Sequence, residues 1–330
     1  MIELNEQSAK SFLAKNGIKN SKIKKIAGDA SFRSYYRIFV KESGEEKKYV
    51  LMYAPPSHED TKPFVRIDEF LVVNGFSAPK IFSRDEENGF LLLEDFGDDS
   101  YSRVLAKDSN QELELYKKAC DCLIQLHAIS PNRIKDLQGL SRYNHALFFR
   151  EVNLFLEWYL PQKGKKITLQ EKADFKSLWF ELFDLLSKED QVLVLRDYHA
   201  DNLMFLPNMD GYKQVGLLDF QDAVIGSKAY DLVSLLEDAR RDVDEKNREK
   251  ILKYFLEKSG SDKSVLLRDY EILSLQRNIK ILGIFSRLSL RDGKHAYLKL
   301  LPRVLNFVET RLCSKNLIFS EIGKFLKTFL

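Results

Sequence analysis

The sequence predicts an α+β chain with two lobes, a small strand-rich lobe followed by a larger lobe that is mainly helical. Early in the chain, short runs of β-branched and aromatic residues alternate with turn-forming residues, and one helical pattern occurs among them. After "FGDDS" (96–100), long amphipathic helical patterns dominate instead. We therefore expect an N-terminal lobe over residues 1–96 and a C-terminal lobe over residues 97–330.

The small lobe is expected to be an antiparallel sheet with one helix. "ESGEE" (42–46) is typical of a hairpin turn. "PFVRIDEFLVVNG" (63–75) has apolar residues at helical spacing, with Pro63 suited to a helix start and Gly75 to a helix end. Four segments have the composition of strands: "SYYRIFV" (34–40), "KKYVLMY" (47–53), "PKIFSR" (79–84) and "GFLLLED" (89–95).

The large lobe is expected to consist of helices around one island of strands. The helical patterns cover residues 111–129, 144–160, 168–187, 229–241, 245–259, 266–290 and 295–327. The island contains "QVLVL" (191–195), "LMFLP" (203–207) and "VGLLDF" (215–220). Between the first two of these runs lies the polar loop "RDYHADN" (196–202), which has apolar neighbours on both sides. Its polar groups are therefore candidates for function.

The composition argues against several classes of function. The 52 Lys and Arg residues nearly balance the 49 Asp and Glu residues, so no basic excess indicates a nucleic-acid surface. Three cysteines are too few for a disulfide framework and indicate a reducing compartment. The N-terminus lacks the apolar run of a signal peptide, and no stretch approaches the roughly 20 apolar residues of a membrane span. We expect a cytoplasmic monomer that binds neither nucleic acid nor membrane.

Three oxygen-bearing side chains carry the expected chemistry. Asn202 follows Asp197 by five residues, so one loop can present both, and Asp219 ends the apolar run "VGLL". Mg²⁺ in proteins takes one or two carboxylates and completes its shell with waters and substrate phosphates. Phosphoryl transfer needs such a metal and a carboxylate that orients the accepting hydroxyl. We expect the three side chains to converge around one divalent cation, although Asp197 and Asp219 also suit plain turn positions.

These motifs resemble a known family. "RDYHADN" followed by "LLDF" is similar to the catalytic loop and the metal-binding segment of the aminoglycoside phosphotransferase family. The resemblance implies a bilobal protein-kinase-like fold that uses ATP and Mg²⁺, with the nucleotide on the first lobe and the acceptor on the second. It also implies that Asp197 is the catalytic base and that Asn202 and Asp219 bind the metal. "AYDLVSLLEDARRDV" (229–243), with Tyr230 and Asp231, resembles the segment that supports the catalytic loop.

The first lobe carries a weaker resemblance. "AGDASFRSYYRI" (27–38) occupies the place of the phosphate-covering loop, although an ordinary hairpin would show the same pattern. Small residues there let backbone N–H groups approach phosphate oxygens. "GFLLLEDFGD" (89–98) resembles the hinge strand that pairs with adenine, and Glu69 resembles the helix residue that holds the phosphate-binding Lys. The implied nucleotide-binding residues are Gly28, Ala30, Ser31, Phe32, Arg33, Glu69, Leu93, Glu94 and Asp95.

Two positions depart from the family pattern. Leu195 stands two residues before the expected base, where many relatives have a His that acts mainly as a brace. In "YVLMYAPP" (49–56), no Lys or Arg occupies the strand position near Met52 or Tyr53 that normally binds phosphate. Phosphate neutralisation would then come from Arg33, from Arg37 or from the metal alone.

A narrower resemblance indicates the substrate. "SFRSYYRI", "LRDYHADNLM", "LLDFQDAVIG" and "QRNIKILGIFSRL" are similar to segments of the anomeric N-acetylmuramate/N-acetylglucosamine kinases of bacterial cell-wall recycling. In that group the missing strand Lys is usual. The resemblance implies transfer of the γ-phosphate of ATP to the C1 hydroxyl of an amino sugar. Kinases of aminoglycosides or choline, and a nucleotide-binding pseudokinase scaffold, are the alternatives.

Candidate sugar ligands lie in the second half of the chain. Polar groups on helix faces that should be core either satisfy one another or meet a ligand. Arg240 or Arg277 would bind a lactyl carboxylate as a fork. His199 could serve as a second base, but a His in such a loop more commonly braces backbone carbonyls. The candidate substrate-binding residues are His199, Asp222, Arg240, Gln276, Arg277 and Asn278.

Overall fold

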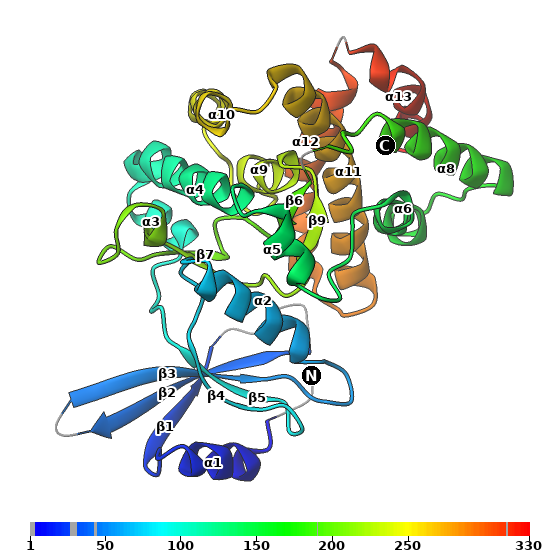
Figure 1. Cartoon of the computed structure of the whole chain (residues 1–330). Helices are drawn as coiled ribbons and strands as arrows, with labels where there is room; N and C mark the ends of the chain where they lie inside the picture. Colours follow the sequence, from blue (N-terminus) through cyan, green and yellow to red (C-terminus); the bar gives the residue numbers. More distant parts are fainter. Residues whose placement is uncertain (1–3, 27–31, 43–44, 190, 315) are drawn as a thin grey trace. The chain divides into compact units, whose positions relative to one another are not determined.

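The computed structural model describes residues 4–26, 32–42, 45–189, 191–314 and 316–330 (Figure 1). By their internal contacts the residues divide into two units. The N-terminal unit comprises Met1–Val104 with Asp201–Asp222, and the C-terminal unit comprises Leu105–Ala200 with Ala223–Leu330. A small antiparallel sheet in the first unit and helices through most of the second confirm the α+β class. The lobe boundary between residues 96 and 97 stays a prediction.

A five-stranded antiparallel sheet forms the centre of the N-terminal unit. Its strands are β1 (Ser21–Lys25), β2 (Ser34–Glu42), β3 (Glu45–Tyr53), β4 (Ile81–Asp85) and β5 (Phe90–Glu94). Their order in the sheet is β1-β2-β3-β5-β4. The four strands expected from the sequence are confirmed, and β1 is an addition to them.

Alternating burial along β2 explains which face of the sheet is covered. Tyr36, Ile38 and Val40 are buried, whereas the residues between them are partly exposed. Helix α1 (Glu6–Lys15) contributes Phe12 and Leu13 to the same apolar cluster. Figure 1 shows α1 along this sheet.

The hairpin between β4 and β5 requires a glycine at position 89. Gly89 has a φ of +73°, a conformation that side chains rarely adopt. A Cβ atom there would lie 1.9 Å from the carbonyl oxygen of Ala54, whose own N–H donates to Gly89 O at 2.8 Å. The glycine thus lets the hairpin approach the end of β3.

Helix α2 and a β-hairpin add the other candidate residues to the N-terminal unit. Helix α2 (Lys62–Val73) begins with Pro63 in its first turn and confirms the expected helix. The hairpin of β7 (Leu203–Phe205) and β8 (Val215–Leu217) joins this unit through a bridge between Ser77 and Gly216. Helix α3 (Tyr101–Lys107) follows β5 along the chain.

The C-terminal unit is built around the 28-residue helix α11 (Lys263–Leu290), which is buried on most of its circumference. A glycine permits a close crossing of this helix: a Cβ on Gly283 would lie 2.3 Å from the carbonyl carbon of Leu154. The two short strands of this unit, β6 (Val192–Val194) and β9 (Val224–Gly226), pair antiparallel. Its other helices are α4 (Glu112–His127), α5 (Pro131–Asp136), α6 (His145–Leu154), α7 (Leu160–Gln162), α8 (Leu169–Asp184), α9 (Ala229–Leu236), α10 (Glu245–Ser259), α12 (Leu301–Leu312) and α13 (Ser320–Lys327).

Several helix boundaries differ from the sequence prediction. The pattern over 144–160 becomes α6, a π-helical turn (Phe155–Tyr159) and the start of α7. The pattern over 295–327 divides into a 3₁₀ segment (His295–Leu300), α12 and α13. Proline in the first turn of α12 and the side-chain cap of Asn316 on Ile318 N–H mark these breaks. In the part of the chain that the structure describes, no helix combines the length and apolarity that a membrane crossing needs.

Candidate active site

The polar loop begins with a strained turn that the C-terminal unit holds in place. Arg196 has a φ of +72°, and Asp219 is the other non-glycine residue with positive φ in the described ranges. Such conformations cost about 1–3 kcal/mol each and cluster at functional sites. The carboxylate of Asp231 on α9 accepts the backbone N–H groups of Leu195 and Arg196 at 2.7 and 2.8 Å. The expected support of the loop by Asp231 is therefore confirmed.

The Arg196 side chain enters a buried polar network centred on Glu151 of α6. Glu151 is 5% exposed and accepts hydrogen bonds from Lys280 Nζ at 3.2 Å and from Gln276 Nε2 at 2.8 Å. It also forms an ion pair with Arg196, whose Nε donates to the hydroxyl of Tyr143 at 3.0 Å. Burial opposes ionisation of Glu151, but the charges of Lys280 and Arg196 hold its pKa below the ordinary value. The loop is thereby tied to α6 and α11.

Asp197 lies in a strongly positive environment. Burial alone would raise its pKa, but the charges of Lys280, Arg277 and Arg196 outweigh burial and lower it. Its carboxylate is therefore ionised at neutral pH, the form that accepts a proton. All of these groups belong to the C-terminal unit.

His199 is neutral and braced. Arg240 Nη1 donates to His199 Nε2 at 3.1 Å, and because a guanidinium cannot accept, we assign the ring proton to Nδ1. Burial lowers the pKa of His199, and the charges of Arg240 and Arg277 add to this effect against those of Asp238 and Asp197. These contacts favour the bracing role of His199 over that of a second base.

Three consecutive polar residues of α11 are buried, namely Gln276, Arg277 and Asn278. Gln276 donates to Glu151, and Asn278 Nδ2 donates to Glu237 at 2.8 Å, while the side-chain oxygen of each is buried without a hydrogen-bond partner among the described residues. Arg277 Nη2 donates to Ser234 Oγ at 2.8 Å. Its Nη1 is buried without a hydrogen-bond partner among the described residues. Arg277 is the member of this run with a donor left for a ligand.

Hairpin register brings Asn202 and Asp219 together in the N-terminal unit. Leu203 pairs with Leu217, so the residues just before β7 and just after β8 are neighbours. Leu218 N–H donates to Asn202 O at 3.0 Å, and Asn202 Nδ2 lies 3.4 Å from Asp219 Oδ2. The predicted metal ligands are thus adjacent, while Asp197 belongs to the other unit and its place beside them stays a prediction.

The adjacent amide and carboxylate suit a hard divalent cation. The Asn202 amide can be turned so that its oxygen and an oxygen of Asp219 face one ion. Within the described ranges no group of three or more His, Cys, Asp or Glu side chains forms a metal cage. A cation here would therefore take the rest of its shell from water and phosphates, as Mg²⁺ does.

Two cationic or amide side chains also contact Asp219. Gln221 Nε2 donates to Asp219 Oδ1 at 2.9 Å, and its other contact is Asp222 Oδ2 at 3.4 Å. Arg33 Nη2 lies 3.8 Å from Asp219 Oδ1, with its side chain 10% exposed. Phe32 precedes it as an exposed ring beside His58. Gly28, Ala30 and Ser31 lie outside the described residues.

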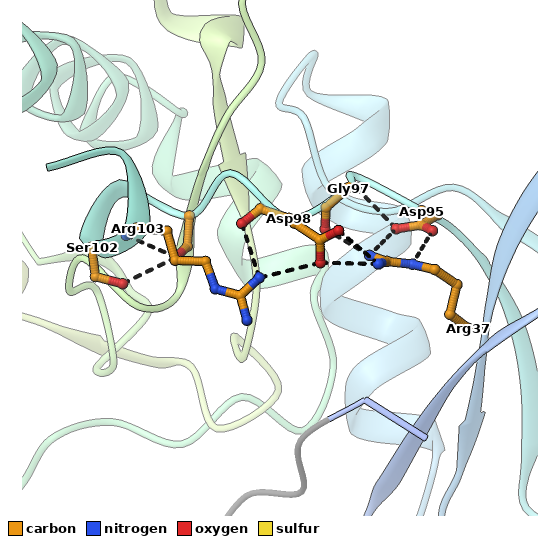
Figure 2. A network of polar contacts seen from close by, with 7 residues as sticks. Arg37, Asp95, Gly97, Asp98, Ser102 and Arg103 are labelled. Carbon is orange, nitrogen blue, oxygen red and sulfur yellow. Dashed lines mark hydrogen bonds and ion pairs between the residues drawn. The ribbon is translucent and has the colours of Figure 1, made fainter. Parts of the chain in front are cut away.

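Residues 95–98, at the end of the segment that we expect to be the hinge, form their own polar network (Figure 2). Arg37 Nε pairs with Asp95 Oδ2 at 2.6 Å, and Arg37 Nη1 pairs with Asp98 at 2.9 Å. Arg37 Nη2 also donates to Gly97 O at 2.8 Å, and Arg103 contacts Asp98 at 3.2 Å. All three nitrogens of the Arg37 guanidinium therefore contact Asp95, Gly97 or Asp98.

The remaining nucleotide-binding candidates lie on β5 and α2. Leu93 is buried and pairs with Val50 of β3, and the Glu94 carboxylate accepts Lys80 N–H at 3.1 Å. Glu69 is exposed, and its carboxylate pairs with Arg84 of β4 at 3.2 Å. The partner of Glu69 is thus an exposed Arg of β4, whereas the resemblance implies a phosphate-binding Lys.

Sequence reasoning missed two residues that organise the loop. Glu151 lies in a helical pattern with several aromatic residues, which usually indicates packing rather than a polar site. Lys280 stands alone in "NIKILGIF" (278–285), an apolar run that the structure buries. A lysine in such a run requires a buried acid, and this signal indicates that a partner such as Glu151 exists.

Comparison with known proteins decides the family. The profile of the phosphotransferase enzyme family (APH) matches residues 22–270. The chain belongs to this family. Among curated members, it is 32% identical to the N-acetylmuramate/N-acetylglucosamine kinase of Caulobacter vibrioides, covering 92% of this chain and 91% of that protein. It is 34% identical to the enzyme of the same name from Pseudomonas aeruginosa, covering 91% and 86%.

Solved structures of phosphotransferases share the fold. The gentamicin complex of APH(2″)-IIa has a TM-score of 0.64 at 16% identity, over 92% of this chain and 97% of that one. Ethanolamine kinase from Plasmodium vivax has a TM-score of 0.62 at 15% identity, over 97% and 96%. These matches confirm the kinase-like fold. As a member of the phosphotransferase family, the chain is an enzyme.

Proposed function

We propose that this phosphotransferase moves the γ-phosphoryl group of ATP to the C1 hydroxyl of an amino sugar such as N-acetylmuramate or N-acetylglucosamine, for peptidoglycan recycling. The observation that carries the proposal is the identity of 32–34% with kinases named for these two sugars, over about nine-tenths of this chain. The kinase motifs "RDYHADN" and "LLDF" lie within the matched region.

In the proposed reaction Asp197 orients and deprotonates the acceptor. The C1 oxygen forms a bond to the γ-phosphorus while the bond from that phosphorus to the bridging oxygen of ADP breaks. The hydroxyl proton passes to Asp197, which the cations Lys280 and Arg277 keep ionised. A Mg²⁺ ion held by Asn202 and Asp219 would neutralise charge between the phosphates.

The charges around Asp197 favour an acceptor that is not a polycation. Arg277 and Lys280 both act on the Asp197 carboxylate, and Arg240 lies exposed above His199. A multiply charged aminoglycoside would bring further positive charge to these groups. The carboxylate of N-acetylmuramate would instead find a fork in Arg277, whose buried Nη1 has no partner among described residues.

A cytoplasmic location is part of the proposal. Cys120, Cys122 and Cys313 are all free thiols, as expected in a reducing compartment that also supplies ATP. The monomeric state remains an expectation from the sequence.

Substitution of Asp197 tests the proposal. In Asp197→Asn we expect nucleotide binding to persist and turnover to fall at least about 100-fold, the lower end for loss of a general base. ADP release is measured across N-acetylmuramate, N-acetylglucosamine, aminoglycosides and choline, and ³¹P and ¹H NMR locate the new phosphate. Asp201→Asn makes the same change in the same loop and serves as control. Wild-type turnover in Asp197→Asn, or phosphate on a hydroxyl other than C1, would contradict the proposal.

A further inference from the structure

The small lobe lacks the usual phosphate-binding cation on its third strand. In related kinases a Lys on this strand pairs with the α- and β-phosphates. Here the end of β3 offers Leu51 and Met52, both fully buried, and then Tyr53. The lysines of β3 lie at its other end, where Lys48 pairs with Glu46. A side-chain cation for the phosphates would therefore have to come from another segment.

Arg37 is excluded because its guanidinium is already used. Two of its nitrogens meet Asp95, one meets both oxygens of Asp98, and the Gly97 carbonyl accepts a further bond. Figure 2 shows the side chain directed at this hinge segment. Removing it to bind phosphate would leave Asp95, which is 4% exposed, without its cation.

Arg33 differs from Arg37 in its contact with Asp219. Tyr35 pairs with Met52, so the two residues share a face of the sheet. Arg33 lies just before β2 and precedes Tyr35 by two residues, so an extension of the strand's alternation would place it on this face, as Arg37 is placed two residues after Tyr35. Its Nη2 lies 3.8 Å from Asp219 Oδ1, beside the Asn202 amide of the candidate cation site.

The acids around Arg33 hold a guanidinium where phosphate would arrive. Besides Asp219, the charges of Glu59 and Asp222 act on Arg33. The contact with Asp219 places this side chain, which is 10% exposed, beside the candidate metal ligands, and the charges of Glu59 and Asp222 favour a cation there. A guanidinium is suited to such a place, because its planar fork can bind two phosphate oxygens while a remaining N–H still meets a carboxylate.

We propose that Arg33 replaces the strand Lys and binds the phosphate chain of the nucleotide next to Asp219. The inference rests on the proposed function for its ligand, a nucleoside di- or triphosphate. It assigns Arg33 to nucleotide affinity, and it leaves the acceptor to the residues around Asp197.

Nucleotide binding without acceptor tests the inference. Affinities of ATP, ADP and adenosine are measured by calorimetry for wild type, Arg33→Met, Arg33→Lys and Arg291→Met. Arg291 is an exposed residue paired with Asp292 at the end of α11, so its substitution removes the same charge at a distant surface. For Arg33→Met we expect ATP and ADP to bind about 10- to 100-fold more weakly, the usual loss for a charge-assisted hydrogen bond. Adenosine should bind unchanged, and Arg33→Lys should recover part of the loss.

The outcomes separate the two proposals. Wild-type ATP and ADP affinity in Arg33→Met would overturn the role of Arg33, whatever the acceptor is. An equal loss for adenosine would also overturn it, since the effect would then not depend on phosphate. If Arg33→Met weakens the binding of ATP and ADP but not of adenosine, and the wild type phosphorylates no sugar, the inference stands and the proposed acceptor fails.

Discussion

A buried carboxyl group on α2 provides a quantitative test of the fold. Asp68 is 1% exposed, and its Oδ1 has no hydrogen-bond partner among the residues that the structure describes. Burial raises its pKa, and the negative charges of Glu69 and Glu94 raise it further, to about 8. The side chain is therefore neutral in the native protein at pH 7. We expect Asp68→Asn, which is neutral and similar in shape, to stabilise the protein.

The magnitude follows from proton linkage. The ordinary pKa is 3.8, so between pH 3.8 and about 8 the native state binds one proton more than the unfolded state. The free energy of unfolding then falls as pH rises, by about 1.4 kcal/mol for each pH unit. About three pH units separate 3.8 from 7, so the cost of Asp68 at pH 7 is roughly 4 kcal/mol. Asp68→Asn should recover up to that amount at pH 7 and almost nothing near pH 3.

Urea unfolding of both proteins between pH 4 and pH 8 measures this difference, with equal m-values as the condition for comparing midpoints. Asp136→Asn, at an exposed position, serves as the control and should show no growing difference. Glu69→Gln removes one of the two negative charges that raise the pKa of Asp68. It should therefore also stabilise the protein at neutral pH, by less than Asp68→Asn does. A difference for Asp68→Asn that stays constant with pH would refute the reasoning, because it would show that Asp68 is ionised or paired in the native state.

Three further substitutions or measurements follow from the C-terminal unit. Glu151→Gln leaves two buried cations without their carboxylate, so we expect the free energy of unfolding to fall by about 3–5 kcal/mol, measured in urea. Gly283→Ala places a Cβ 2.3 Å from the Leu154 carbonyl carbon and should lower the free energy of unfolding by at least about 1–3 kcal/mol. In the control Gly323→Ala the nearest atom to the new Cβ is Leu312 Cδ2 at 3.7 Å, so no loss of stability is expected. Equal effects of the two substitutions would refute the close crossing. Because the pKa of Asp197 is lowered, this base should stay ionised as the pH falls from 7 to about 5, and kcat/KM measured over that range should not fall through its protonation. A loss of kcat/KM with an apparent pKa above 6 would contradict the positive environment of Asp197.

Local patterns predicted the sheet well where both faces of a strand are distinct. The alternation in "SYYRIFV" (34–40) marks β2, whose Tyr36, Ile38 and Val40 are buried while their neighbours are partly exposed. Strand β1, "SKIKK", was not predicted because Ile23 is its one apolar residue. It lies at the sheet edge, where lysines protect against further pairing. Its strand state comes from pairing with β2, which no local pattern records.

The candidate site was predictable to the extent that it is written in contiguous motifs. Asn202 and Asp219 follow from "RDYHADN" and "LLDF", and a hairpin register of three residue pairs makes them neighbours. The network of Glu151 and Lys280 joins residues 129 positions apart. A sequence can show that a buried lysine needs an acid, but the packing of α6 against α11 decides which acid it meets.

The two left-handed residues show that side-chain identity outweighs backbone preference at both parts of the candidate site. Glycine would adopt the φ angles of Arg196 and Asp219 at little cost, yet a cation and an acid stand there. Arg196 offsets the strain through its ion pair with Glu151 and through Asp231, which fixes its N–H. Asp219 has contacts with Asn202, Gln221 and Arg33, and the buried Phe220 packs on Phe64 beside it. Strain at one of these positions would need only a structural explanation. Here Arg196 directly precedes the proposed base Asp197, and Asp219 is itself a proposed metal ligand. Strain at both positions favours a functional explanation, in which the backbone is strained because it orients these side chains.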